Sequence, residues 1–187
     1  MKMKNYIWVS ALALLSLATS CKKDKDDPTN PNPTPNETEL ITSVQLQFTD
    51  SANVQPDATF SFRDPDGDGG ADPVQFDTIR LAANTTYFAT IILLDESKTP
   101  TDTISNEVAE ESADHMFFFA HNGVNIATTY TDIDVNGLPI GLSTRWVTGT
   151  SGTGTSTVTL KHQPGVKDGT QAPGETDVEV QFRSEVQ

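Results

Sequence analysis

A period-two alternation of apolar and polar residues is the feature that most limits how this chain can fold. Such spacing places one side of an extended strand in a core and the other side in water. The alternating apolar positions are Val44, Leu46 and Phe48; Phe60 and Phe62; Val74 and Phe76; Val124, Ile126 and Tyr130; Ile140, Leu142 and Trp146; Val158 and Leu160; and Val178, Val180 and Phe182. A further segment, "TTYFATIILL", is apolar almost throughout, which predicts a central strand covered on both faces.

The number and spacing of these segments predict the fold class. About eight or nine strands, separated by Gly, Asn, Asp and Pro, predict a single immunoglobulin-like β-sandwich over residues 40–187, with a β-barrel as the alternative. One segment, "TDTISNEVAEESADH", departs from the alternation. It contains good helix formers, a cap at Thr103 or Ser105, and Ile104 and Val108 on one face, so we expect a short helix over 104–114.

The N-terminal segment predicts export and a lipid anchor. Residues 1–20 begin with two lysines, continue with a short apolar run and end in small residues, which is typical of a signal peptide. Cys21 is the chain's only cysteine, and its setting after "LATS" resembles the bacterial lipobox. We therefore expect a lipidated Cys21, with a secreted protein carrying a free thiol as the alternative. Residues 21–39, rich in Pro, Asn and Asp, predict a disordered tether.

Strong acidity excludes several partners. The chain carries 12 basic and 26 acidic residues; removing Lys2 and Lys4 with the signal peptide leaves ten basic residues and a net charge of −16. Nucleic acid and anionic membrane surfaces are poor partners for such a field, whereas cations are attracted to it. The alternative is that the acidity only keeps an exported protein soluble.

The stretch "RDPDGDGGAD" has the oxygen spacing of a calcium-binding loop. With Asp64 as position 1, the other candidate ligands at positions 3, 5 and 9 are Asp66, Asp68 and Asp72, and Gly69 stands at position 6. Position 12 is Gln75, where such loops have a bidentate glutamate. A polar turn between two strands explains the stretch equally well.

A weaker version of the same spacing occurs in "TDIDVNGLPIGL". Here Asn136-Gly137 is a preferred two-residue hairpin turn. Pairing outward from that turn predicts Ile133 opposite Ile140, with Asp132 and Asp134 on the wetter face.

A second candidate site combines carboxylates with histidines. Glu107, Glu111 and His115 are spaced so that a continuous helix would align them on one side. The other two histidines are His121 and His162, and His162 continues the face of Val158 and Leu160. Such donors suit Zn²⁺ or Cu²⁺, whereas the alternative is a solvated acidic helix with incidental histidines.

Catalytic signatures are absent from the sequence. It contains no G-x-S-x-G elbow, no H-E-x-x-H helix and no phosphate loop, which favours a non-enzymatic protein. Three triplets match an O-glycosylation pattern of Bacteroidota, at Asp50-Ser51, Asp77-Thr78 and Asp102-Thr103.

Several longer stretches resemble a family of small outer-membrane lipoproteins of Bacteroidota. They are "RDPDGDGG", "LAANTTY", "NGLPIGL", "TVTLKHQPG" and "PGETDVEVQF". Members of that family often accompany TonB-dependent receptors. The resemblance implies lipid anchoring to the outer membrane, on its periplasmic or cell-surface face, and an auxiliary role in uptake.

Together these features favour a non-enzymatic module that binds a metal cation or small ligand. The alternative function is a structural or adhesive domain that contacts another envelope protein or a glycan, with calcium only stiffening a loop.

Overall fold

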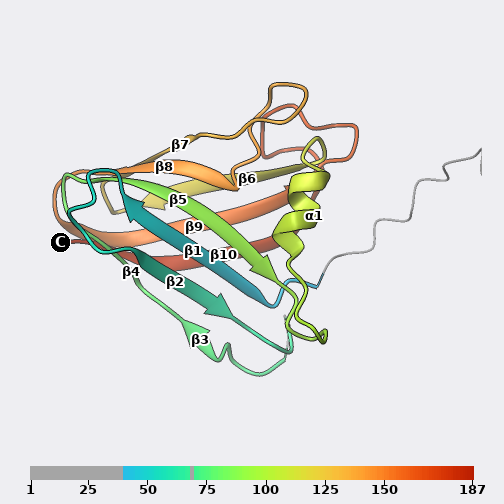
Figure 1. Cartoon of the computed structure of the whole chain (residues 1–187), viewed down its shortest axis with the longest axis horizontal. Helices are drawn as coiled ribbons and strands as arrows, with labels where there is room; N and C mark the ends of the chain where they lie inside the picture. The colour runs from blue at the N-terminus through green and yellow to red at the C-terminus, as the bar shows by residue number, and fades with distance from the viewer. Residues whose placement is uncertain (1–39, 68–69) are drawn as a thin grey trace, which may run out of the picture. The chain divides into compact units, whose positions relative to one another are not determined.

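The computed structural model describes residues 40–67 and 70–187. The predicted signal peptide, Cys21, the tether and Asp68 lie outside the described residues. Two β-sheets pack face to face, and one short helix lies at an end of the sandwich (Figure 1). Within the described part, no helix is long and apolar enough to cross a membrane.

The larger sheet has six strands in the order β3-β2-β1-β5-β8-β7, all antiparallel. Its strands are β1 (Ser43–Asp50), β2 (Ala58–Arg63), β3 (Gln75–Phe76), β5 (Thr86–Leu94), β7 (Ile126–Tyr130) and β8 (Ser143–Thr148). The smaller sheet has the order β4-β10-β9-β6, comprising β4 (Ile79–Leu81), β6 (His115–Asn122), β9 (Gly152–His162) and β10 (Glu175–Val186). Only the β4–β10 pair is parallel among these described strands.

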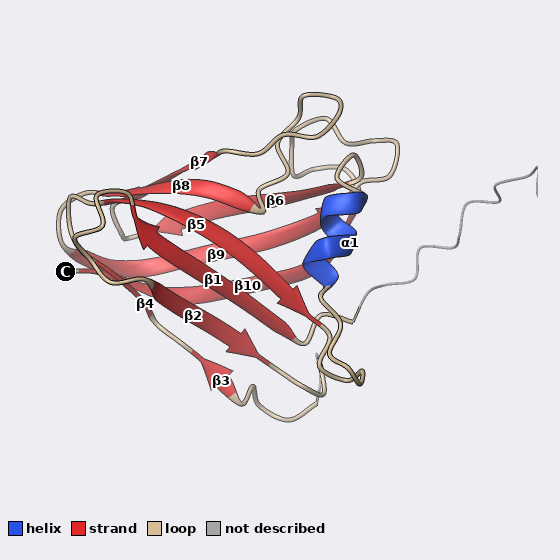
Figure 2. Ribbon diagram, viewed as in Figure 1, coloured by secondary structure: helices blue, strands red, loops and turns tan. Residues whose placement is uncertain are grey.

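This architecture confirms the predicted all-β sandwich, and the barrel alternative is wrong because the strands form two separate sheets (Figure 2). The described residues contain ten strands, slightly more than expected. The two strands without a counterpart in the predicted pattern are β4, which is three residues long, and β6.

The core lies between the sheets and is filled by alternate residues of each strand. Phe48, Phe117, Trp146 and Phe182 are fully or almost fully buried. The Trp146 ring meets Phe48 edge-on at a centroid distance of 5.1 Å, a favourable aromatic geometry.

Two details of the predicted pattern are wrong. β5 is not covered on both faces: Tyr87 and Ile91 are buried, whereas Phe88 is 52% exposed, because within the described residues its outer face carries no second layer. Val74 and Phe76 are exposed as well, because β3 is a two-residue strand at the sheet edge.

The helix α1 (Ile104–Glu110) is shorter than the predicted 104–114. Ile104 and Val108 are buried as expected, but the side chain of Thr103 at the N-cap position makes no capping hydrogen bond. The helix ends early because the chain must enter β6, where the Asp114 carbonyl accepts a bond from the Gln163 amide and extends the pairing with β9.

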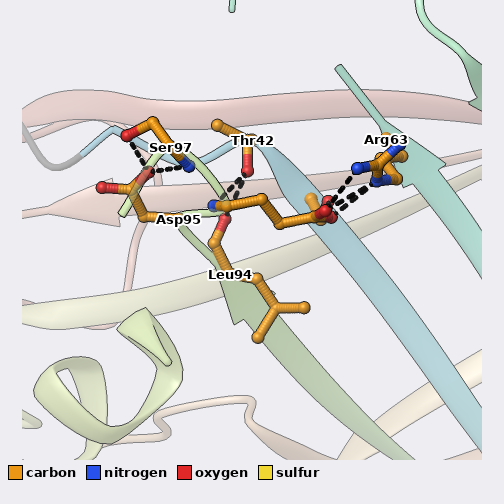
Figure 3. A network of polar contacts seen from close by, with 7 residues as sticks. Thr42, Arg63, Leu94, Asp95 and Ser97 are labelled. Carbon is orange, nitrogen blue, oxygen red and sulfur yellow. Dashed lines mark hydrogen bonds and ion pairs between the residues drawn. The ribbon is translucent and has the colours of Figure 1, made fainter. Parts of the chain in front are cut away.

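A polar network fixes the connection that leads from β5 into α1. The Thr42 hydroxyl donates to the Leu94 carbonyl, at 3.0 Å, and accepts from the Glu96 amide, at 2.9 Å. The Glu96 carboxylate accepts hydrogen bonds from the Arg63 guanidinium, whose Nε lies 2.8 Å from both carboxylate oxygens. The Asp95 carboxylate accepts two hydrogen bonds, from the amide and the hydroxyl of Ser97 (Figure 3). These contacts hold the segment after β5 against the start of β1 and the end of β2.

The segment between β7 and β8 differs from the predicted hairpin. Ile133 bridges Pro139 rather than Ile140, and it is 67% exposed while Asp134 is only 6% exposed. Asp134 is buried because its Oδ1 accepts the amides of Asn136 and Leu138 and its Oδ2 accepts the Lys167 ammonium at 2.8 Å.

Candidate metal site

The candidate site lies where the smaller sheet meets the end of α1. His115 begins β6 and His162 ends β9, and the two residues are direct cross-strand partners. Facing residues of an antiparallel pair project from the same side of the sheet. Their imidazole rings accordingly stack, with centroids 4.4 Å apart and an interplanar angle of 7°.

Glu111 completes a cluster of three possible ligands. It follows the last residue of α1, and a turn closed by the Asp114 amide on the Glu111 carbonyl, at 2.9 Å, leads into β6. One carboxylate oxygen of Glu111 and one nitrogen each of His115 and His162 lie within 4.8 Å of one another. His115 is buried, His162 half-buried and Glu111 exposed, so the cluster has one closed side and one side open to solvent.

The tautomer of His115 follows from its hydrogen bond. Its Nδ1 lies 3.2 Å from the backbone carbonyl oxygen of Glu111, which can only accept, so Nδ1 donates and Nε2 carries the lone pair. Burial, reinforced by the nearby His162, lowers the pKa of His115 despite the Glu111 carbonyl and the Asp177 carboxylate. The ring is therefore neutral at pH 7, the form in which histidine binds metals.

Asp177 is a fourth polar group that the sequence did not reveal. Its Oδ2 lies 3.8 Å from His115 Nε2, its side chain is 7% exposed, and this oxygen has no hydrogen-bond partner among the described residues. In β10, Thr176 opposes Lys161 and Val178 opposes Leu160, so Asp177 is the extra residue of a β-bulge. Strict alternation with Val178 would have pointed Asp177 outward; bulges redirect side chains in this way.

Glu107 and His121 do not join this cluster. Glu107 is one helical turn before Glu111. The pKa of Lys98 is raised mainly by its hydrogen bond to Asp102, with smaller contributions from the charges of Asp95 and Glu107. His121 lies on the same face of β6 as His115 but six residues away, which is about 20 Å along a strand. Both its nitrogens are occupied, by Ser156 Oγ at 2.8 Å and Thr128 Oγ1 at 2.9 Å.

The predicted calcium loop shows no comparable gathering of ligands in its described residues. Asp64 is buried at the end of β2, where its amide donates to the Thr42 carbonyl. The carboxylate of Asp66 accepts the Ala71 amide at 2.8 Å, and Asp66 and Asp72 are exposed. Because Asp68 lies outside the described residues, calcium binding by this loop stays a prediction.

The chain is similar to no protein-family model, no curated protein and no solved structure. The fold and the site define the class of this protein as a β-sandwich with a histidine and carboxylate cluster where the smaller sheet meets the end of a short helix.

Proposed function

We propose that this protein is an outer-membrane lipoprotein whose sandwich is a non-enzymatic binding module for a divalent metal cation, auxiliary to TonB-dependent uptake. The observation that carries the binding role is the convergence of Glu111, His115 and His162 within 4.8 Å. The anchor at Cys21 and the uptake role rest on the sequence and its resemblance to Bacteroidota lipoproteins.

The donor chemistry favours a transition metal over calcium. Imidazole nitrogen suits zinc, copper and similar ions, whereas calcium takes oxygen ligands alone. A neutral His115 needs no deprotonation before it binds. The candidate ions are therefore Zn²⁺ and Cu²⁺ at this cluster.

The exposure of the ligands favours a site that exchanges its metal. Here Glu111 is exposed and His162 is half-buried, so an ion would enter and leave from the solvent side. The net charge of the mature chain raises the local concentration of cations around this opening.

The binding role is tested by titrating the tag-free mature protein with Zn²⁺, Cu²⁺ and Ca²⁺ in a calorimeter. We expect one zinc or copper ion per chain and at least a tenfold loss of affinity in Glu111→Gln. Glu110→Gln, which removes a charge from the neighbouring exposed helix position, is the matched control and should bind within twofold of wild type. A wild-type protein that binds neither zinc nor copper refutes the proposal.

The anchor is tested separately in cells. Radiolabelled fatty acid should be incorporated into the full chain and lost in Cys21→Ala. Incorporation that survives this substitution would contradict the lipoprotein assignment.

A further inference from the structure

We infer that Asp177 is the fourth ligand of this site, so that one divalent transition-metal ion is held by two imidazoles and two carboxylates. The inference rests on the proposed function, since it adds a ligand and an ion class to the same site. It adds Asp177, through its contact with His115, to the cluster of Glu111, His115 and His162 and makes the site four-coordinate.

The contact between His115 Nε2 and Asp177 Oδ2 brings together two hydrogen-bond acceptors with no donor from the described residues between them. His115 Nε2 bears a lone pair because Nδ1 donates to the Glu111 carbonyl, and Asp177 Oδ2 is an acceptor when ionised. Their separation of 3.8 Å exceeds that of a hydrogen bond. Two facing acceptors are stabilised when a hydrogen-bond donor or a cation lies between them.

The separation suits a metal ion. Histidine nitrogen and carboxylate oxygen each lie about 2.0–2.2 Å from zinc, so two ligands of one tetrahedral ion are about 3.3–3.6 Å apart. The observed 3.8 Å exceeds this by a few tenths of an ångström, which a small side-chain rotation closes. Hydrogen bonds within the protein, by contrast, leave Asp177 Oδ2 unsatisfied in the described part of the chain.

Burial makes Asp177 costly without such a partner. A buried carboxylate oxygen that lacks a hydrogen bond destabilises a fold, and the Asp177 side chain is 7% exposed with its Oδ2 unpartnered among the described residues. A bound cation would offset this cost.

The scaffold around the buried pair is rigid. His115 and Asp177 are both held by the four-stranded sheet, where β6 and β10 flank β9. Sites built on strands hold their ligands more accurately than sites on loops. Two nitrogen and two oxygen donors select zinc-like ions over calcium and magnesium, while Cu²⁺ competes through its greater intrinsic affinity.

The test compares Asp177→Asn with Glu179→Gln in the tag-free mature protein. Glu179 is an exposed carboxylate two residues further along β10 that accepts a hydrogen bond from the Thr159 hydroxyl, so its substitution removes the same charge from the same strand. We expect the zinc affinity to fall at least tenfold in Asp177→Asn and to stay within twofold of wild type in Glu179→Gln. With Co²⁺ as the probe, the visible absorption typical of tetrahedral sites should weaken in Asp177→Asn alone.

Thermal unfolding of the metal-free proteins gives a second readout. Asp177→Asn removes an unsatisfied buried charge, so its metal-free midpoint should equal or exceed that of wild type, while its stabilisation by zinc should be smaller. Asp177→Ala, which removes the oxygen ligand altogether, should show the same loss of zinc affinity.

The outcomes separate this inference from the proposed function. Zinc binding by wild type that is unchanged in Asp177→Asn and Asp177→Ala overturns the inference alone. The same holds if Asp177→Asn lowers the metal-free midpoint and keeps the zinc affinity, because the residue would then share a proton with His115. Absence of binding in wild type overturns both.

Discussion

The buried ion pair between Lys167 and Asp134 offers the clearest test of the energetics of this fold. Their side chains are 2% and 0% exposed, and Lys167 Nζ lies 2.8 Å from both Asp134 Oδ2 and the Ser112 carbonyl. The pair thereby joins the loop 163–174 to the segment 131–142 and to the chain just after Glu111 (Figure 1).

Asp134→Asn should lower the free energy of unfolding by about 3 kcal/mol. Removing one partner of a buried ion pair costs about 3–5 kcal/mol, and a hydrogen bond to a charged group contributes about 1.5–3 kcal/mol. The expected loss lies where these ranges meet because Asn retains an oxygen for the amides of Asn136 and Leu138, and Lys167 keeps the Ser112 carbonyl. For a domain of this size the midpoint should fall by about 6–10 °C.

Urea unfolding followed by tryptophan fluorescence measures this loss, since Trp146 is the only tryptophan outside residues 1–20. Glu185→Gln is the control: it breaks the Arg80–Glu185 pair, whose side chains are 53% and 31% exposed, and should cost less than about 1 kcal/mol. Combining Asp134→Asn with Lys167→Met should cost less than the sum of the two single changes. A loss below about 1 kcal/mol in Asp134→Asn would refute the reasoning.

The pH dependence of this pair has a defined sign. Burial opposes ionisation of Asp134, but the bonds from Lys167, Leu138 and Asn136 outweigh it and lower the pKa of the carboxyl below its ordinary value of 3.8. A lowered pKa in the folded state gives stability that is present above about pH 4 and is lost as the pH falls further. Asp134→Asn should therefore flatten the stability profile below pH 4.

Three further predictions concern other parts of the fold. Gly174→Ala should destabilise the start of β10, because φ is +77° there and an added Cβ would lie 2.1 Å from the His162 carbonyl oxygen. It should also weaken zinc binding measured by calorimetry, and an unchanged zinc affinity would contradict this. Burial lowers the pKa of His121 to about 4, so its contribution to stability rises between about pH 4 and 6.5. In urea titrations across that range, the free energy of unfolding of His121→Gln should rise less steeply than that of wild type. An equal slope would exclude the effect. Phe117→Ala, which empties a fully buried position, should cost about 3–5 kcal/mol in the same assay, and a cost below about 1 kcal/mol would mean that the core collapses around the gap.

The sandwich could be predicted because alternation reports directly on which side of a strand is buried. Val44, Leu46 and Phe48 alternate in the sequence and are all buried in β1. The nearly unbroken apolar run of β5 predicts burial on both faces, but apolar side chains alone do not show whether a second layer covers the outer face. Edge strands as short as β3 have the same local pattern as longer ones, and only their place in the sheet exposes them.

The candidate site was predictable only in part, because ligands meet through pairing rather than through local spacing. Glu111 and His115 do lie together, but a turn brings them together rather than a continuous helix. His162 could be assigned to the correct face, yet its partner depends on the register between β6 and β9. His121 shares a face with His115, but its position six residues further along β6 keeps it outside the cluster.

The bulge at Asp177 has a consequence for insertion and deletion in this chain. Because Thr176 and Val178 oppose consecutive residues of β9, Lys161 and Leu160, a chain lacking Asp177 would pair as an uninterrupted ladder. Val178, Val180 and Phe182 would keep their places in the core, so the sheet could lose this residue without a change of phase. Deleting Asp177 would therefore leave the sandwich intact and remove the buried carboxylate. A chain with this deletion distinguishes what the fold needs from what the site needs.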